Sequence, residues 1–472
     1  MWPWLNETVR QFESSFSRRT TFCWFAIILL GLMLRSDHLG ITSIVREFSL
    51  AAGAYPAMLH FFRSEGWHVE RLKCAWLRIV ASTHLPIKEA GRYILIGDGV
   101  KQAKEGRKMP GVKKLHQESD NSSKSEYMHG HLYGGLGILA GSGSKLYSVL
   151  LSVRLHDGIA ALQEWLWGDG HDEESHVVKM IRDASSAVRQ LGESILLLDR
   201  LFLTRPMLLA LAETPGLCVV TKAKANATAF YPPGPYKGRG ARPKKGRVVR
   251  LAGFFSSETF AACEINLYGK EQTVRFFSVD LLWGKGLYRP LRFVLTVLAD
   301  GTKSILVSTD LTLHPADIVR LYCRRFKIEC AFRELKQVVA GFAYHFWSKA
   351  MPRLQKFKSN AINHENLKNV TDPEKRRLIK SAVNAIEGYV HISVMALGLL
   401  QLAGLLFGQE INHSGGRFMR TVSNPVPSER TVADFMRKNI YMLFRFFPDM
   451  ALTSIIRARQ SERFDNDSQW VA

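Results

Sequence analysis

The segment from residue 92 to residue 222 mixes short apolar runs with amphipathic stretches, and this order limits the possible folds more than any other feature of the chain. The apolar runs have the length of buried strands, and the amphipathic stretches repeat apolar residues at helical spacing. In chain order they are strands at 92–97, 127–140 and 146–155, a helix at 175–192, a strand at 194–198, a helix at 204–213 and a strand at 217–221. The order predicts a mixed sheet in which parallel strands and helices extend three antiparallel strands.

Helical patterns flank the core, and a strand-rich stretch at 251–310 separates this segment from a closing helix. The basic, apolar-striped start of the chain fits either a solvated helical bundle or a DNA-binding domain. We therefore expect an α/β fold with a β-rich insertion and helical ends. The predicted regions are a helical N-terminal region at 1–90, the first part of the core at 91–225, a basic loop and β-rich insertion at 226–312, a closing core helix at 313–350 and a helical C-terminal region at 351–472.

The chain carries a large excess of positive charge, which informs about its partners rather than its fold. Lys and Arg total 64 against 42 Asp and Glu over 472 residues, a formal net charge of +22. Such a protein usually binds a polyanion, with nucleic acid the first choice and an anionic membrane surface the second. The 46% of hydrophobic residues excludes wholesale disorder. Six scattered cysteines without a CxxC pair favour reduced thiols in a cytoplasm over a disulfide framework or a zinc ribbon.

Two apolar stretches test the possibility of a membrane span. Residues 22–34 are too short to cross a bilayer, and their flanks do not match a signal peptide. Residues 388–408 are long enough, but they contain His391, Ser393 and Gln401. Polar residues inside a run of this length favour a buried core helix, so we predict no membrane span.

Two aspartates follow buried strand runs. Asp98 ends the run RYILIG, and Asp199 ends SILLL. Two such strands side by side would bring two carboxylates within reach of one cation, and Mg²⁺ is bound in proteins by a few carboxylates with water and substrate phosphates. Each aspartate alone is more often a turn or helix cap, so the pair needs further support.

A long helix predicted over residues 315–344 supplies a third group. Tyr322, Arg325, Glu329 and Lys336 lie at offsets of 0, 3, 7 and 14. At about 100° per residue they fall within roughly 60° of arc and share one helix face. Glu329 would be a third metal ligand, and the two cations would pair with phosphate. Glu334 lies about 120° away on the same helix and is the weaker candidate. The alternative is a solvated face with internal ion pairs.

The stretch from 231 to 250 is rich in Pro and Gly and strongly basic. Its sequence KGRGARPKKGRVVR carries seven cations and no acid. Such runs are usually solvated loops, but this one can also follow a phosphate backbone. Lys244, Lys245 and Arg247 are its candidate DNA-binding residues.

The string YCRRFKIECAFRELK matches the signature Y-(2)-R-(3)-E-(6)-K at Tyr322, Arg325, Glu329 and Lys336 without a change of spacing. This signature resembles that of the DDE transposases of bacterial insertion sequences, in the insertion-sequence-four superfamily. The resemblance covers roughly residues 92–348. Its other segments are YILIGDGVKQAKEGRKMPGVKKLHQ, YMHGHLYGGLGIL, SILLLDRLFL, LVSTDLTL and YHFWSK.

The resemblance implies an RNase H-like catalytic domain, with a β-rich insertion between the second Asp and the Glu. Asp98, Asp199 and Glu329 then map onto a triad that holds two Mg²⁺ ions, for which Mn²⁺ can substitute. Tyr322, Arg325 and Lys336 map onto residues that hold DNA near the cleaved end. Relatives hold a flipped base with an aromatic residue of the insertion, and location alone makes Trp283 the candidate here. A Trp packed inside a β domain is the commoner case.

The function implied by the resemblance is that of a transposase. It would bind the ends of its mobile element in double-stranded DNA, cleave them by metal-dependent hydrolysis and transfer the 3′ ends to target DNA. The resemblance also implies a homodimer on paired ends, with the C-terminal helices as pairing surfaces, in the bacterial cytoplasm at the nucleoid. Three alternatives stay open: a non-catalytic or repurposed DNA-binding protein, another RNase H-like nuclease, and a basic membrane-associated protein built on residues 388–408.

Overall fold

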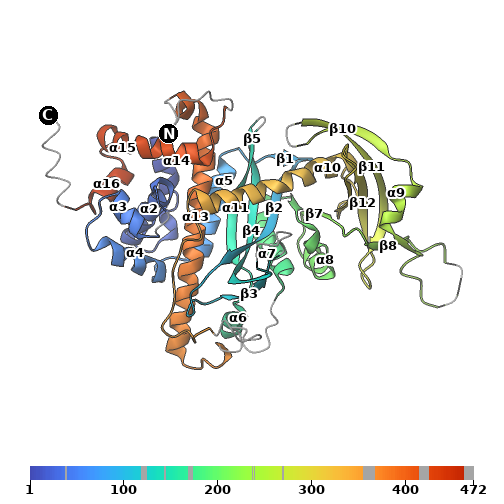
Figure 1. Cartoon of the computed structure of the whole chain (residues 1–472), viewed down its shortest axis with the longest axis horizontal. Coiled ribbons are helices and arrows are strands. Elements are labelled where there is room, and N and C mark those ends of the chain that lie inside the picture. The colour runs from blue at the N-terminus through green and yellow to red at the C-terminus, as the bar shows by residue number, and fades with distance from the viewer. Residues whose placement is uncertain are drawn as a thin grey trace.

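The computed structural model describes the chain except residues 38–39, 118–124, 143–144, 168–173, 237, 239, 268–269, 355–366, 414–424 and 462–472. The two ends of the chain form one helical body on one side of a large sheet (Figure 1). Its N-terminal helices are α1 (Trp2–Arg10), α2 (Arg19–Leu34), α3 (Thr42–Glu47), α4 (Ala54–Arg63) and α5 (Val69–Ser82). Its C-terminal helices are α13 (Pro373–His413), α14 (Glu429–Lys438), α15 (Ile440–Phe446) and α16 (Ala451–Arg457).

One mixed sheet runs through the rest of the molecule. The strands of its first half are β1 (Lys88–Glu89), β2 (Arg92–Ala103), β3 (Lys113–His116), β4 (Tyr127–Ser142), β5 (Lys145–Leu155), β6 (Ser194–Leu197) and β7 (Leu217–Lys222). The order across the core is β5-β4-β2-β6-β7; the first two pairings are antiparallel, and the last two are parallel. This is the predicted arrangement of three antiparallel strands with two parallel additions, and the mixed α/β fold class with helical ends is confirmed.

The β-rich insertion continues the same sheet. Its strands are β8 (Thr228–Phe230), β9 (Val248–Arg250), β10 (Ala261–Leu267), β11 (Lys270–Trp283), β12 (Arg289–Val297) and β13 (Lys303–Ser308). β13 pairs antiparallel with β7, so the backbone hydrogen bonds cross from the core into the insertion. The insertion is therefore tied to the strand that follows Asp199, and its helix α9 (Phe254–Ser257) lies at the far end in Figure 1.

Helices cover both faces of the core sheet. α7 (His176–Leu191), capped by the Ser175 hydroxyl, packs on one face beside α8 (Arg205–Ala212), and α6 (Ala160–Trp167) precedes it. α11 (Lys327–Gln337) lies on the other face, where a Cβ added to Gly135 would be 2.5 Å from the Phe332 ring. Glycine at this position of β4 therefore allows α11 to approach the sheet closely.

The helix predicted over residues 315–344 is divided and shorter. It consists of α10 (Pro315–Cys323), a 3-10 turn at Arg324–Phe326 and α11, which ends at Gln337. Ala340, with a φ of +50°, turns the chain out of the helix, and the backbone N–H of Gly341 donates to the Leu335 carbonyl. The apolar run after Gln337 resembles helical periodicity, but these residues are buried in an extended segment instead.

The strand predicted to end near Asp98 also differs, because β2 continues for five residues beyond it. Residues 99–103 pair with residues 130–134 of β4, which is long enough to supply partners for the whole of β2. The residues that directly follow Asp98 are thus strand as well. Asp98 lies within β2, one residue before Gly99, rather than at the free end of a strand.

α13 is the helix that is long and apolar enough to cross a membrane among the residues described. Its most apolar stretch has a mean hydropathy of 2.0, and 83% of that stretch is buried inside the protein. The polar side chains within it have partners there: Ser393 donates to the Tyr389 carbonyl, and the Gln401 amide donates to Glu429. Residues 388–408 are the predicted buried core helix.

Two buried histidines and the half-buried His176 make stability depend on pH. Burial lowers the pKa of His131, His176 and His391 to about 3, whereas burial raises the pKa of Asp98 to about 6. The unfolded chain takes up three protons on these histidines below about pH 6.5, while the folded chain takes up one on Asp98. Stability should therefore fall by about 2–3 kcal/mol per pH unit near pH 5. Urea unfolding at pH 7, 6 and 5 measures this, and equal stability at all three would contradict it.

Candidate active site

The two predicted aspartates lie side by side on neighbouring parallel strands. β2 pairs with β6 up to Ile96 and Leu197, and two more residues along each strand bring Asp98 level with Asp199. Adjacent strands are about 4.8 Å apart. The carbonyl of Asp199 accepts a hydrogen bond from the Thr221 hydroxyl of β7, which fixes its backbone. Its side chain makes no capping hydrogen bond to the 3-10 turn that follows, so the carboxylate is not used as a helix cap.

Arg325 joins Asp98 to the third predicted carboxylate. Its guanidinium donates from one nitrogen to Asp98 Oδ2 at 2.9 Å and from the other to Glu329 Oε1 at 2.5 Å. Asp98 pairs with Gly135 across the sheet and shares its face, which α11 covers. Strand β2, the 3-10 turn and α11 therefore bring these three side chains together, although 231 residues separate the two acids.

The electrostatics show how closely charges are packed here. Burial raises the pKa of Asp98 to about 6, and the negative charges of Asp199 and Glu329 act in the same direction. The Arg325 charge and the Gly99 N–H oppose that shift. Burial alone would lower the pKa of Arg325, but Asp98 raises it above its ordinary value, so the guanidinium remains charged. The site is thus a cluster of acids that holds one cation.

A pocket of about 330 Å³ opens beside the acids. Burial raises the pKa of Tyr322, which lines this pocket, so its hydroxyl remains a donor at neutral pH. The full lining is Asp199, Arg200, Lys222, Tyr322, Cys323, Arg325 and Phe326. Three of these residues are cationic, so the pocket suits a phosphate next to the acids.

Lys222 and Arg200 were not among the residues predicted from the sequence. Lys222 ends β7, and Arg200 directly follows Asp199. A signal was available, because ligands of α/β sheets bind outside the carboxyl ends of parallel strands. Charged residues at the carboxyl end of any parallel strand are therefore candidate site residues, as the two aspartates are.

The three carboxylates are suitable ligands for Mg²⁺, but the Arg325 guanidinium occupies the space between two of them. Three carboxylates are hard oxygen ligands of the kind that Mg²⁺ binds. Among the residues described, no group of three or more His, Cys, Asp or Glu side chains is placed to hold a metal ion. Arg325 instead satisfies Asp98 and Glu329. The metal triad stays a prediction, and binding of an ion between these acids requires Arg325 to move.

The other predicted DNA contacts lie farther away. Lys336 is exposed on α11, seven residues or about 10 Å along the helix from Glu329, with its Nζ 5.9 Å from the centre of the Phe342 ring. Trp283 ends β11 and is half-buried. The pairings of β11 with β12, β12 with β13 and β13 with β7 place Trp283 level with the start of β7, three residues before Val220. Asp199 follows the opposite end of the neighbouring strand β6. The structure does not bring Trp283 to the acids.

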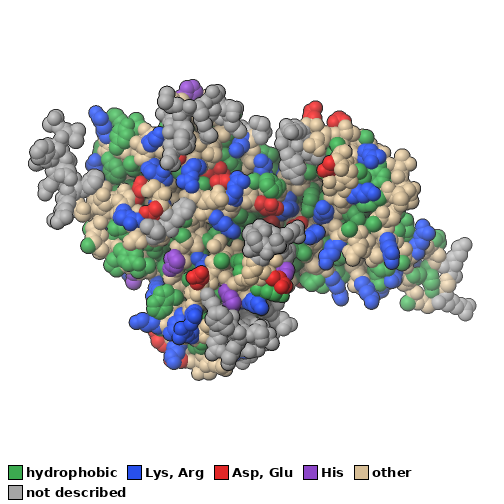
Figure 2. Space-filling model, in the orientation of Figure 1, with side chains coloured by type: hydrophobic (Ala, Val, Ile, Leu, Met, Phe, Trp, Pro, Cys, Tyr) green, Lys and Arg blue, Asp and Glu red, His purple; other side chains and the backbone are tan. Residues whose placement is uncertain are grey.

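Lys244, Lys245 and Arg247 lie in the connection between β8 and β9, which projects from the insertion (Figure 1). All three are exposed, and Lys245 and Arg247 lie over aromatic rings: the Nζ of Lys245 is 4.3 Å from the centre of the Phe230 ring. Figure 2 shows several Lys and Arg side chains gathered over this side of the molecule. These residues form a cationic surface separate from the acid cluster.

A polar network that the sequence did not indicate lies behind Asp98, on the α7 face. His156 Nε2 is 3.0 Å from Asp183 Oδ2, and His156 Nδ1 is 2.8 Å from His176 Nδ1. Burial alone would raise the pKa of Asp183, but His156 and Arg154 lower it. The His176 ring is so close to Gly99 that a Cβ added there would be 3.0 Å from its Nε2. This network therefore supports β2 directly beside Asp98.

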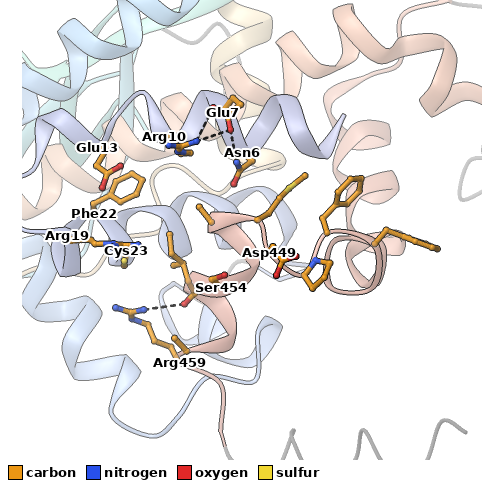
Figure 3. A pocket seen from close by; sticks show the side chains of 17 residues that line it. Asn6, Glu7, Arg10, Glu13, Arg19, Phe22, Cys23, Asp449, Ser454 and Arg459 are labelled. Atoms are coloured by element: carbon orange, nitrogen blue, oxygen red, sulfur yellow. Dashed lines mark hydrogen bonds and ion pairs between the residues drawn. The ribbon is translucent and has the colours of Figure 1, made fainter.

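A larger cavity, of about 990 Å³, lies elsewhere in the molecule (Figure 3). It is bounded by α1, α2 and the C-terminal helices α15 and α16. Glu7 accepts hydrogen bonds from Asn6 and Arg10 at its edge, and Asp449 lies across from them. Its lining mixes both signs of charge with aromatic rings, so it lacks the excess of cations that marks the pocket beside Asp199.

Gly135→Ala tests how closely α11 must approach the sheet. The added Cβ would collide with the buried Phe332 ring, so α11 and Glu329 must shift, and we expect a loss of roughly 1–3 kcal/mol in the free energy of unfolding. Gly253→Ala is the control, since no atom lies within 4 Å of the new Cβ and its φ is −61°. Urea unfolding compares the two variants, and equal stabilities would show that this contact is dispensable.

No protein-family model matches this chain, and no curated protein matches it. Among solved structures, the chain is similar to a cryo-EM structure of the piggyBac transposase synaptic complex with hairpin DNA. The sequence identity is 12%, the alignment covers 98% of this chain and 80% of that chain, and the TM-score is 0.40. A likeness at this level does not carry a function from one protein to another, so the function must be derived from the residues of the site.

Proposed function

We propose that this protein is a transposase of the DDE type, which cleaves DNA at the ends of its mobile element and joins the new 3′ ends to target DNA. The observation that supports this most is the meeting of three acids: Arg325 bridges Asp98 and Glu329, and Asp199 lies level with Asp98 beyond the end of the neighbouring parallel strand. The basic pocket beside them suits the phosphodiester of a DNA strand.

The acids would hold two Mg²⁺ ions, or Mn²⁺ in their place. Bound there, such ions supply an activated hydroxyl for attack at phosphorus and stabilise the leaving oxygen. The residues of this chain do the positioning. Arg325 turns from Asp98 and Glu329 toward a phosphate, which its planar fork binds with two hydrogen bonds. The Tyr322 hydroxyl donates to a phosphate oxygen, and Lys222 adds a positive charge at the pocket wall.

The finer features of the proposal follow the resemblance of the signature. They are membership of the insertion-sequence-four superfamily, action as a homodimer on paired double-stranded ends, and a place in the bacterial cytoplasm at the nucleoid. α15 offers a surface for pairing, because Tyr441 and Phe446 are each more than half exposed. Lys336 and the cationic connection of Lys244, Lys245 and Arg247 would contact DNA away from the cleaved bond.

The first test is Mg²⁺-dependent cleavage of duplex DNA that carries the sequences flanking this gene. We expect cuts at defined ends in Mg²⁺ or Mn²⁺, none in EDTA, and joined products when target DNA is added. Cleavage without joined products would favour another RNase H-like nuclease. Solubility of the purified protein without detergent would dismiss the membrane-associated alternative.

One observation favours a second candidate, a DNA-binding protein that does not cleave. Arg325 neutralises two of the three acids, and if it cannot leave them the site binds no metal ion. In that case the flanking DNA would be bound but left uncut with every divalent cation. Binding of the same DNA in EDTA, measured beside the cleavage assay, separates the two candidates.

A further inference from the structure

A second basic groove, of about 880 Å³, lies between the end of β2 and the extended segment that follows α11. Residues 103–109 form one wall, and His345, Trp347 and Arg353 form the other. Backbone hydrogen bonds join the walls: Ser348 N–H donates to the Lys108 carbonyl at 3.2 Å, and Leu354 N–H donates to the Arg107 carbonyl at 2.7 Å. The groove is therefore built into the fold.

Trp347 presents its ring to solvent because of the register of this segment. From Phe342 to Lys349 burial alternates: Phe342, Tyr344, Phe346 and Ser348 are buried, whereas His345, Trp347 and Lys349 are exposed. An extended chain places alternate side chains on opposite faces, so the buried aromatics anchor the segment while Trp347 faces outward. It is 49% exposed, which is unusual for the largest apolar side chain.

The cations around Trp347 are available for a ligand. Arg107, Lys108 and Arg353 are exposed, and none of them forms an ion pair with an acid in the described part of the chain. Lys104 is committed to the fold: its Nζ donates to the carbonyls of Phe342 and Tyr344, and burial lowers its pKa to about 8. Lys108 Nζ donates one long hydrogen bond, of 3.4 Å, to the Lys349 carbonyl. Three exposed cations for which the described residues supply no acidic partner and one exposed ring thus line the groove, with Glu105 as the acid in its lining.

The groove lies on the same strand as the acid cluster. Lys104 follows Asp98 by six residues, which is about 20 Å along an extended strand. Lys336 lies between the acid cluster and the groove. Its Nζ faces the ring of Phe342, and the Phe342 carbonyl accepts a hydrogen bond from Lys104. A nucleic-acid strand that passes the acids can therefore continue over Lys336 into the groove.

We propose that this groove binds single-stranded DNA, with a base stacked on Trp347 and the phosphates held by Arg107, Lys108 and Arg353. An exposed aromatic ring among unpaired cations is the combination that binds single strands without regard to sequence, because every base has a face that can stack. A duplex keeps its bases stacked on each other and would use the cations alone. The choice of DNA over RNA rests on the proposed function of the acid cluster.

The affinities for single-stranded and duplex DNA are measured by fluorescence anisotropy in EDTA, with a labelled oligothymidine of twelve nucleotides and a duplex of the same length. Trp347→Ala should weaken binding of the single strand by on the order of tenfold and change duplex binding less than twofold. Trp347→Phe should retain most of the affinity, since it keeps a stacking face. Tyr55→Ala removes another exposed aromatic, on α4, and should have no effect. Thermal melting confirms that each variant is folded.

The phosphate contacts have their own readout. Arg107→Ala should reduce the slope of log affinity against log salt by roughly 0.7 for the single strand, whereas Arg189→Ala on α7 should not. Equal losses for single strand and duplex in Trp347→Ala, or no loss in either, would overturn the proposal. A tenfold preference for oligouridine would overturn the choice of DNA. The binding assays are done in EDTA, which prevents metal-dependent cleavage. They therefore test the groove even if the protein proves to have no transposase activity.

Discussion

Replacement of Glu329 by glutamine should abolish DNA cleavage while the protein still binds the ends of its element. Metal-assisted phosphoryl transfer depends on charged ligands, and loss of several kcal/mol of transition-state stabilisation corresponds to a rate about a thousandfold lower. Asp98→Asn and Asp199→Asn should do the same, because these residues lie level on adjacent strands in the same cluster. Cleavage of an end-labelled duplex measures the rate, and a gel-shift assay in EDTA measures binding.

Glu334→Gln is the matched control on the same helix. Glu334 is paired with Arg333 and belongs to neither the Arg325 bridge nor the pocket lining. Its variant should cleave as the wild type does. If one of the three predicted ligands keeps wild-type cleavage when it is replaced, that residue is not a ligand. If Glu334→Gln is inactive, the helix contributes its acids differently from the arrangement proposed here.

Arg325→Ala should bind Mn²⁺ more tightly but be less stable without metal. The two effects together would show that Arg325 occupies the place of a metal ion. Without DNA, Mn²⁺ should bind more tightly, on the order of tenfold, because the metal no longer competes with the guanidinium for Asp98 and Glu329. In EDTA the variant should be less stable by roughly 1–3 kcal/mol, since it leaves the half-buried Asp98 beside two other acids without a counter-charge. Isothermal titration with Mn²⁺ and urea unfolding in EDTA provide the two measurements.

Arg324→Ala controls for the loss of a neighbouring ion pair. Arg324 pairs with Glu89 outside the acid cluster, so its removal should cost some stability and leave Mn²⁺ affinity unchanged. Arg325→Lys keeps the charge but loses the fork, and it should restore part of the stability in EDTA. Equal Mn²⁺ affinity in wild type and Arg325→Ala would show that the guanidinium does not compete with the metal.

The core of the fold was predictable because its signals are local. The strands at 127–140 and 146–155 and the helix at 175–192 match β4, β5 and α7 within a few residues. Each has a clear periodicity and a cap or turn signal, such as Ser175 before α7. The beginning of α13 at Pro373, after Asp372, follows from the same kind of signal.

What the sequence could not supply depends on partners distant in the chain. The extension of β2 past Asp98 needs the length of β4, and the end of α11 needs Ala340 in a left-handed conformation. Helical spacing places Arg325 and Glu329 on one face, but it does not indicate that the guanidinium also reaches Asp98. Location in the chain alone makes Trp283 a candidate, and only strand register reveals its distance from the acids.

The burial of α2 ties the beginning of the chain to its end. α2 is almost wholly apolar, and the helices that pack on it include α13, α14 and α16. A ribosome releases α2 early and those helices last, so for most of translation this apolar helix lacks much of its cover and needs protection from aggregation. A gene copy that stopped before Pro373 would produce a protein that stays in that state. Truncation, which is often harmless at a terminus, would here remove the solubility of the whole product.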